Sequence, residues 1–452
     1  MTETVVEAIT APSDIAAEDL YRERRDRFGA QADELARRST RLANVRLLLF
    51  FAALAALGWG YWGGIPLLLG LGGLLLIAFA ALVARHRSVE RERRRCVALA
   101  TINHEALARV RRDWDALPLR HDLRAEPGHP YAHDLDLFGR ASLLHLLEAV
   151  GTRLGEETLA GWLTAPAEPT TVAERQTAVR ELAPGVDWRD DLLRRARGSG
   201  EGERPDAEPF LAWAEGEPWL TRQPALLWTA RLSPLAFWGL LVAHLAGAIA
   251  YPLWLAPFAL NLVLGWRLAG PAVRTLERVG LLTQRFGGYA DALELLAETP
   301  FESPALRRVR AAATVDGVSA AEQIRRLHRI TIFAQPPSSL LYTLIESTTL
   351  WNVHVLAALE GWQARVGRHA RGWLAALGVA EALSALARLA HDNPAWVMPT
   401  LDPAAPVLDA AGLGHPLLPA DARVANAVQL GPPSTFLLVT GSNMAGKSTL
   451  LR

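Results

Sequence analysis

Ten residues near the end of the sequence have the types and spacing that bind phosphate. Residues 440–449 read Thr-Gly-Ser-Asn-Met-Ala-Gly-Lys-Ser-Thr and fit the pattern Gly-x-x-x-x-Gly-Lys-[Ser/Thr]. Glycines allow the backbone to wrap closely around a phosphate, and successive N–H groups then form a nest for the anion. We expect the ammonium group of Lys447 to reach the β- and γ-phosphates of a nucleotide, and the hydroxyl of Ser448 to bind Mg²⁺.

A loop of this kind needs a strand before it and a helix after it. The apolar run at 434–440 predicts a short buried β-strand. Residues 448–452 could open a helix, whose N-terminus would add the positive end of its dipole to the site. The alternative is a glycine-rich turn that matches the pattern by chance, and the flanking segments argue against it.

The loop resembles the nucleotide-binding loop of the MutS family of mismatch-repair ATPases. That family usually has Pro where this chain has Ser442, and Gly or Ala where it has Ala445. Two upstream segments, 414–418 and 424–426, resemble the segments that precede the loop in MutS proteins. The family often has an aromatic residue, stacked on adenine, at the position of Arg423, whose guanidinium can also stack on a base.

The resemblance implies an ATP- and Mg²⁺-binding P-loop domain that dimerises and shares composite sites, so a homodimer is expected. It also implies DNA as a partner. The predicted cofactor-binding residues are Gly441, Ser442, Asn443, Met444, Ala445, Gly446, Lys447, Ser448, Thr449 and Arg423, with Ser448 as the metal ligand.

The composition bounds the class of protein. A chain of 452 residues predicts two or three domains, and its net charge of zero lacks the basic excess typical of nucleic-acid binders. The single cysteine, Cys96, excludes an internal disulfide framework. Half of the residues are hydrophobic and 15 are Trp, which indicates a membrane protein. The first 45 residues are polar and charged, so no signal peptide is visible.

Two uncharged runs, 47–62 and 65–84, predict a first transmembrane hairpin with its turn at Gly63-Gly64. Trp59, Tyr61 and Trp62 cluster at this turn, as interface aromatics do. Arginines flank both outer ends, which places both ends in the cytoplasm of a bacterial-type inner membrane. A buried soluble hairpin is the alternative. The arginine run at 85–95 could also contact DNA, but its position beside the apolar run favours anionic lipid.

A second apolar pair, 234–249 and 252–264, predicts another hairpin with both ends inside. These runs are shorter and contain Pro257, Asn261 and His244, so a re-entrant or interfacial hairpin is an open alternative. We interpret His244 as a packed or lumen-facing side chain rather than a proton relay.

The remaining segments are predicted to be mainly helical. Segments 134–143 and 152–155, Trp162-Leu163 and the helix at 380–387 resemble parts of the MutS core, the lever domain; a generic helical bundle is the alternative. Helices are expected over 15–46, 97–195, 273–297, 303–329, 340–368 and 372–390, with disorder at 1–12 and a linker at 197–205. Trp162 and Leu163 are expected to pack in the core.

The predicted fold class is therefore mainly α, with transmembrane hairpins, a MutS core-like helical domain and the start of an α/β P-loop (ABC-type) ATPase domain. The predicted domains are an N-terminal cytoplasmic helix (1–45), hairpin 1 (46–84), a helical core-like region (85–231), hairpin 2 (232–268), a lever-like region (269–400) and the P-loop domain (401–452).

Several parts expected of a mismatch-repair ATPase are not found in the sequence. No acidic Walker B strand is recognised, since Val407-Leu408-Asp409 is short and runs into Ala-Ala-Gly, and we interpret the chain as a piece of a longer protein. No Phe is followed two places later by Glu, so the mismatch-reading Phe-x-Glu wedge is missing, and hairpin 2 stands where MutS has its DNA clamp.

We expect a multi-pass, membrane-anchored MutS-like ATPase that contacts lipid. The alternatives are a transporter-type ATPase and a structural membrane protein with a vestigial loop.

Overall fold

The computed structural model describes residues 12–120, 122–198, 204, 206–285, 287–315, 317–334, 342–402, 404, 407–440 and 446–451. The protein is mainly helical and divides into two compact units. Unit 1 comprises 1–146, 186–194 and 389–452, and unit 2 comprises 147–185 and 195–388. The disorder predicted for 1–12 falls outside the described residues, apart from Pro12, the first residue of α1.

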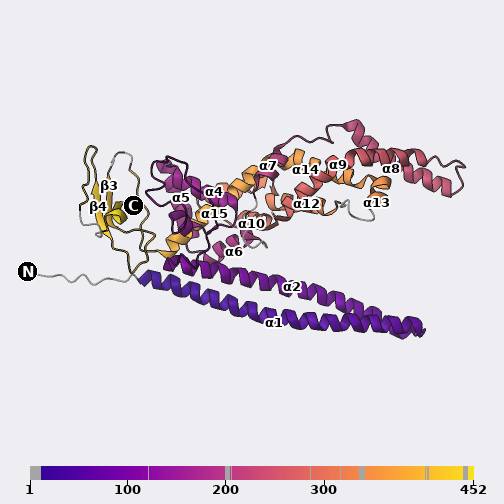
Figure 1. The fold of residues 1–452 in the computed structure, drawn as a ribbon, viewed down its shortest axis with the longest axis horizontal. Helices are drawn as coiled ribbons and strands as arrows, with labels where there is room; N and C mark the ends of the chain where they lie inside the picture. The colour runs from indigo at the N-terminus through magenta and orange to yellow at the C-terminus, as the bar shows by residue number, and fades with distance from the viewer. Residues whose placement is uncertain are drawn as a thin grey trace, which may run out of the picture. The chain divides into compact units, whose positions relative to one another are not determined.

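The first hairpin forms as predicted and dominates unit 1. Helices α1 (Pro12–Trp62) and α2 (Pro66–Arg111) run side by side over most of their length (Figure 1). The turn occupies Gly63-Gly64, and Gly64 adopts a φ of +63°, which glycine reaches without steric cost. The helices approach closely near the turn, because a Cβ on Gly72 would lie 2.5 Å from the Leu57 side chain. The polar helix predicted for 15–46 is the first part of α1.

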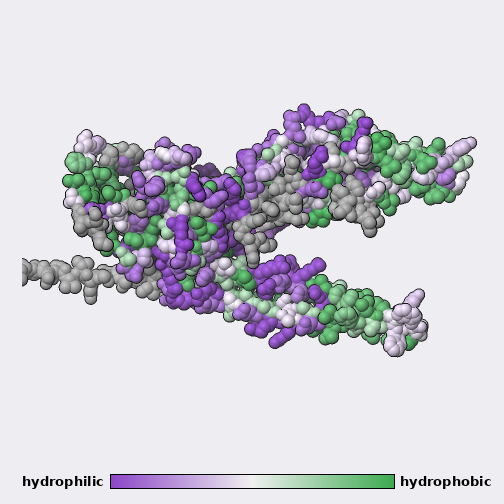
Figure 2. Space-filling view, in the orientation of Figure 1, coloured by the Kyte–Doolittle hydropathy of each residue, from purple (hydrophilic) through white to green (hydrophobic). Residues whose placement is uncertain are grey.

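The apolar part of this hairpin is exposed. Leu67, Leu74 and Ile77 are 82%, 62% and 69% exposed, and Figure 2 shows hydrophobic residues gathered towards the turn and hydrophilic ones farther along the helices. At the other end, Tyr21 and Arg24 are buried: Tyr21 donates to Asp392 (2.6 Å), and Arg24 pairs with Asp190 (3.0 Å). One end of the hairpin is thus anchored in unit 1, while the apolar end is not covered by protein.

The rest of unit 1 contains less regular structure than predicted. Its further elements are α3 (Leu143–Leu147), most of α6 (Val186–Arg197), the antiparallel strands β3 (Leu408–Leu413) and β4 (Asn426–Leu430), and α16 (Lys447–Leu451). The prediction of helix throughout 97–195 is wrong for residues 112–142, whose described part has neither helix nor strand. Arg112 ends α2 in a left-handed conformation, and Pro118, Pro127 and Pro130 each remove a backbone donor that a helix would need.

Unit 2 is a helical assembly. Its elements are α4 (Arg153–Thr164), α5 (Pro169–Leu182), α7 (Glu208–Glu215), α8 (Pro224–Leu245), α9 (Leu255–Arg285), α10 (Gly287–Glu298), α11 (Pro304–Ala312), β1 (Thr314–Val315), β2 (Val318–Ser319), α12 (Ala320–Ile332), α13 (Tyr342–Thr349), α14 (Trp351–Val366), η1 (Gly367–His369) and α15 (Ala370–Asp392), whose last four residues belong to unit 1. Trp362 is central: it stacks on Trp213 (5.9 Å between ring centroids) and meets Trp373 edge-on.

Two predictions for unit 2 need correction. The single helix predicted for 303–329 is interrupted by the β1–β2 ribbon, and Gly317, with a φ of +76°, lies in its turn. Trp162 is only half-buried, with the Arg175 guanidinium 3.9 Å from its ring centroid, so it is not a core residue. The helix predicted for 273–297 corresponds to the end of α9 and most of α10, which begins at Gly287.

Among the described residues, four helices are long and apolar enough to cross a membrane: 16–62, 66–111, 224–245 and 351–392. The first three belong to the two predicted hairpins. The fourth differs, because 72% of its apolar window is buried inside the protein, against 6% in α1 and α2. The second arm of hairpin 2 is a shorter apolar helix, Leu255–Leu268.

Candidate functional site

The described part of the phosphate-binding motif begins at Gly446. Gly446 has a φ of +74°, and its carbonyl accepts a hydrogen bond from the Leu450 N–H at the start of α16. Lys447, Ser448 and Thr449 form the first turn of this helix, as the pattern predicts. The predicted residues Gly441, Ser442, Asn443, Met444 and Ala445 lie outside the described residues.

The buried strand predicted before the loop is not present. Residues 435–440 have no regular secondary structure, and Phe436 and Leu438 are 84% and 74% exposed. A buried strand needs hydrogen-bonding neighbours, and the strands described in this part of unit 1, β3 and β4, pair with each other. The apolar run is therefore without the sheet that would make it a strand.

A pocket of about 420 Å³ lies beside the motif. Its lining combines both upstream segments with the end of the motif: Gly414, His415, Pro416, Val424, Asn426, Gly446 and Thr449 take part. These three segments are the ones that resemble the MutS nucleotide site. A cavity of this size with mixed polar and apolar walls is suited to a small organic ligand.

Arg423 lies beside this pocket and is already in contact with an aromatic ring. Its guanidinium carbon lies 4.9 Å from the centroid of Trp396, within cation–π range. A Cβ on Gly414 would lie 2.8 Å from the Arg423 side chain, so glycine is needed there. Trp396, the aromatic partner of the residue predicted to stack on adenine, was not predicted as part of the site. Its position, 27 residues before Arg423, offered no local signal.

Lys447 is also distinguished by its residue type. It is the only lysine in the sequence, in which every other basic residue besides histidine is arginine. The two are not equivalent at a phosphate, because lysine offers a compact point charge and arginine a planar fork. The one lysine thus occupies the position where the phosphate-binding pattern requires an ammonium group.

Leu408 and Asp409, in the segment that was not recognised as a Walker B strand, are the first residues of β3. β3 continues through Ala410-Ala411-Gly412, so the expectation that this stretch is too short was wrong. Asp409 nevertheless lies on an exposed two-stranded ribbon, opposite Gln429. Among the described residues, no group of three or more His, Cys, Asp or Glu side chains could hold a metal ion. The role of Ser448 as an Mg²⁺ ligand stays a prediction of the motif.

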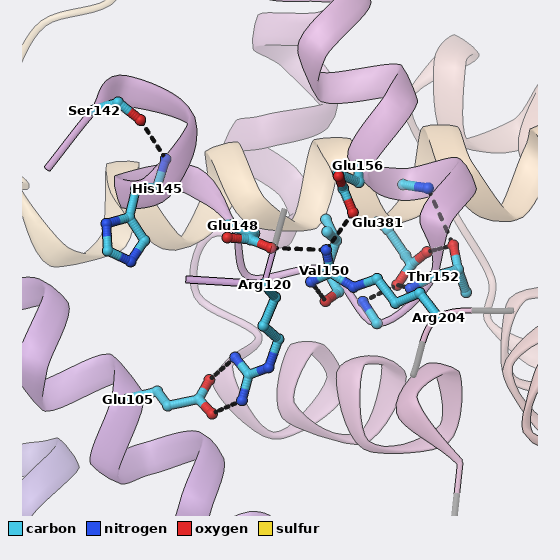
Figure 3. Close-up of polar contacts among 12 residues, drawn as sticks. Glu105, Arg120, Ser142, His145, Glu148, Val150, Thr152, Glu156, Arg204 and Glu381 are labelled. Carbon is cyan, nitrogen blue, oxygen red and sulfur yellow. Dashed lines mark hydrogen bonds and ion pairs between the residues drawn. The ribbon is translucent and has the colours of Figure 1, made fainter. Parts of the chain in front are cut away.

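Unit 2 brings together two of the segments that resemble the MutS core. The Glu381 carboxylate, on α15, accepts hydrogen bonds from the Gly151 N–H (2.5 Å), the Thr152 N–H (3.2 Å) and the Thr152 hydroxyl (Figure 3). Thr152 also caps α4 by accepting from the Gly155 N–H (3.0 Å). A Cβ on Gly155 would lie 2.7 Å from Glu381 Oε2, which explains the glycine.

Burial controls the charge of Glu381. Its complete burial raises the pKa to about 7, although the Thr152 and Gly151 donors and the Arg204 charge oppose that rise. We call this joint between α4 and α15 the Glu381 joint, defined by Gly151, Thr152, Gly155 and Glu381. It connects segments 229 residues apart in sequence.

Arg204 shows that the predicted linker is not simply a solvated connection. Its guanidinium is buried and lies between Glu148 (2.7 Å) and Glu156 (2.5 Å), and it donates to the Val150 carbonyl (3.0 Å), as Figure 3 shows. Arg197 ends α6 and Gly198 is its C-cap, while 199–203 and Pro205 lie outside the described residues. Arg204 therefore fixes one point of this segment next to the Glu381 joint.

Comparisons with protein-family models, with curated proteins and with solved structures give no match to this chain.

Proposed function

We propose that this chain is a membrane-anchored, MutS-like ATP-binding protein, with the nucleotide bound between the 440–449 motif and the pocket beside it. The observation that carries the proposal is that pocket, because three segments singled out by the resemblance line one cavity. In this proposal Lys447 binds the β- and γ-phosphates and Ser448 coordinates Mg²⁺. The base enters the pocket near Val424 and Asn426, and Arg423, supported by Trp396, stacks on it.

The proposal extends to assembly and location. MutS-type ATPase domains act as dimers, so in this proposal the protein is an ATPase that functions as a homodimer, with hydrolysis switching the dimer contact. The apolar hairpin α1–α2 spans the bilayer, and both of its outer ends are cytoplasmic because arginines flank them. We propose no transport activity and no mismatch recognition.

Lys447 permits a direct test of nucleotide binding. As the only lysine, it is the only side-chain amine, so acetylation of the detergent-solubilised full chain can be assigned to it by mass spectrometry without ambiguity. We expect saturating Mg-ATP to protect Lys447 strongly, and the N-terminal amine, measured in the same molecules, to remain unprotected. Equal acetylation of Lys447 with and without Mg-ATP would exclude the proposed site.

Two variants complete this test. Lys447→Ala removes a charge-assisted contact and is expected to weaken ATP binding by about tenfold or more. Arg368→Ala is the matched control, because it removes an exposed basic side chain in unit 2, outside the motif. An equal loss of affinity in both variants would indicate non-specific attraction of ATP to positive charge.

A further inference from the structure

Acidic residues are missing from a long central stretch of the α1–α2 hairpin. No Asp or Glu occurs between Glu34 on α1 and Glu90 on α2. The same stretch contains six arginines, Arg37, Arg38, Arg41, Arg46, Arg85 and Arg87. This charge pattern surrounds the two apolar runs from both sides.

The arginines of this region fall into two groups. Those farther from the apolar runs are paired: Arg37 and Arg38 with Glu34, Arg93 and Arg94 with Glu90, and Arg95 with Glu92. Five arginines have no ion pair or hydrogen bond within the part of the chain that the structure describes: Arg41, Arg46, Arg85, Arg87 and Arg91. All five lie closer along the sequence to the apolar runs than any of the five paired arginines.

Two of these unpaired arginines share a pocket. A cavity of about 450 Å³ between α1 and α2 is lined by Arg38, Arg85, Ser88 and Arg91, among other residues. Arg38 uses only its Nε–H, in its bond to Glu34 (2.9 Å), so its terminal nitrogens remain available to a ligand. Three guanidinium groups around one cavity form a site for an oxyanion, since each presents parallel N–H donors to phosphate oxygens.

One carboxylate also lines this pocket. Glu92 accepts a hydrogen bond from Arg95 (3.3 Å), so its charge has a cationic partner on the same helix. The pocket therefore keeps an excess of positive charge from Arg85 and Arg91.

The pocket begins in the headgroup layer of a bilayer and ends just beyond it. Arg85 directly follows the apolar run that ends at Ala84. With a rise of 1.5 Å per residue, Arg91 lies ~9 Å farther along α2. The headgroup layer on each side of the hydrocarbon core is roughly 5–8 Å thick. Arg95, ~15 Å from Arg85, lies beyond it.

We propose that this pocket binds the phosphate of an anionic phospholipid headgroup, held by Arg85 and Arg91 together with Arg38 and the Ser88 hydroxyl. The proposal rests on the membrane anchoring given under Proposed function. A lipid is favoured over a free phosphate because the site begins at the edge of the apolar run, where the acyl chains of the same lipid would lie against exposed leucines.

The test uses native mass spectrometry of the full chain in mild detergent. Phosphatidylglycerol and phosphatidylcholine with identical acyl chains are titrated separately, and the retained lipid is counted. We expect phosphatidylglycerol to bind more tightly, and Arg85→Gln/Arg91→Gln to reduce its affinity roughly thirtyfold. The matched control is Arg94→Gln/Arg95→Gln, which removes the same charge from paired arginines on the same helix and is expected to lose less than about threefold.

Three outcomes would overturn the site: equal affinity for both lipids, equal losses in the two double variants, or displacement of phosphatidylglycerol by millimolar inorganic phosphate. The last would assign the pocket to a soluble anion. Carbonate extraction of the same variants from membranes separates this proposal from the anchoring. Extraction of the unmodified chain by carbonate would refute the spanning hairpin itself, whereas retention without lipid preference refutes only the headgroup site.

Discussion

Two long apolar regions of this protein have similar composition and opposite environments. Helices α1 and α2 bury 6% of their apolar windows, whereas the run 351–392, comprising α14, η1 and α15, buries 72%. Both are long and apolar enough to cross a membrane. Only the α1–α2 hairpin leaves most of its apolar side chains exposed, and it is the candidate for contact with lipid.

The polar residues of the two regions explain the difference. The run 351–392 carries Glu360, Glu381 and Arg388 at buried positions, and Glu360 accepts hydrogen bonds from three consecutive backbone N–H groups at 219–221. Buried charges are stable where the protein supplies such partners. The stretch 47–84 of the hairpin carries no charged residue at all. Internal charges thus distinguish the apolar run buried in protein from the exposed one, which apolar length alone does not.

Hairpin 2 is intermediate between these extremes. The inner part of α8 joins a core cluster through Ala230, together with Leu268 of α9 and Leu350. Farther along α8, Val242 and Leu245 are 61% and 77% exposed. His244 contacts the Ile249 carbonyl (2.9 Å), consistent with its interpretation as a packed side chain at the turn. An interfacial or re-entrant hairpin agrees with the short second arm as well as a full span does.

The largest effect is expected from the Glu381 joint. Glu381→Ala leaves the donors of Gly151 and Thr152 without an acceptor in a buried site, and should lower the free energy of unfolding by about 3–5 kcal/mol. Urea unfolding in mild detergent, followed by tryptophan fluorescence, measures the change. Glu157→Ala, an exposed position on α4, is the control and should change stability by less than about 0.5 kcal/mol. A loss below 1 kcal/mol for Glu381→Ala would show that the joint is not structural.

A charged residue introduced into the apolar part of the α1–α2 hairpin should have a different energetic cost in lipid and in water. Leu74 is exposed on α2, so Leu74→Arg would be nearly neutral for a hairpin in water. Within a bilayer it should cost about 2.5–3.5 kcal/mol at the centre of the span. Val97→Arg, on the same helix but beyond the arginines, is the control. A membrane-insertion assay with a reporter at the Gly63-Gly64 turn measures the difference, and equal insertion of both variants would favour a soluble hairpin.

The pH dependence of stability provides a third, somewhat smaller effect. Burial raises the pKa of Glu381 from 4.5 to about 7, so the native state holds this proton more tightly than the unfolded chain. The contribution of this proton binding to the free energy of unfolding is fully present below about pH 4.5. It is lost as the pH rises to about 7, by up to about 2–3 kcal/mol. The stability difference between the unmodified protein and Glu381→Gln should therefore decrease over this range. A difference independent of pH would place the pKa of Glu381 outside it.

The sequence predicted the helical parts of the fold well where the signal was local. The Gly63-Gly64 turn, the apolar arms and most helices of unit 2 follow from periodicity and glycine pairs. The irregular region 112–142 was missed because apolar residues there were interpreted as helical in spite of three prolines. The strand at 434–440 was wrong because a strand depends on neighbours that a local pattern does not reveal.

The site was predictable only in part for the same reason. The motif identified Lys447 and the start of α16, and the resemblance singled out both segments that line the pocket. The contact between Arg423 and Trp396 and the bonds between Glu381 and Thr152 join residues far apart in sequence. Such pairs leave no periodic signal in a single sequence, so only the three-dimensional arrangement reveals them.

The smallest expected effect concerns DNA, and it tests what the arginines beside the apolar hairpin bind. Phosphate contacts dominate DNA affinity, and each needs a Lys or Arg directed at the backbone. The unpaired arginines of α1 and α2 adjoin the apolar runs, where the proposed span would place them among lipid headgroups, and the net charge of the chain is zero. The sequence has no Phe-x-Glu wedge to read a mismatch.

We expect weak, strongly salt-dependent DNA binding with a mismatch preference below about tenfold, or about 1.4 kcal/mol. Competition between matched and mismatched duplexes for the detergent-solubilised protein near physiological salt measures this preference. A larger preference would show that a repair function accompanies the MutS-like motif, and that residues other than the family's wedge read the mismatch.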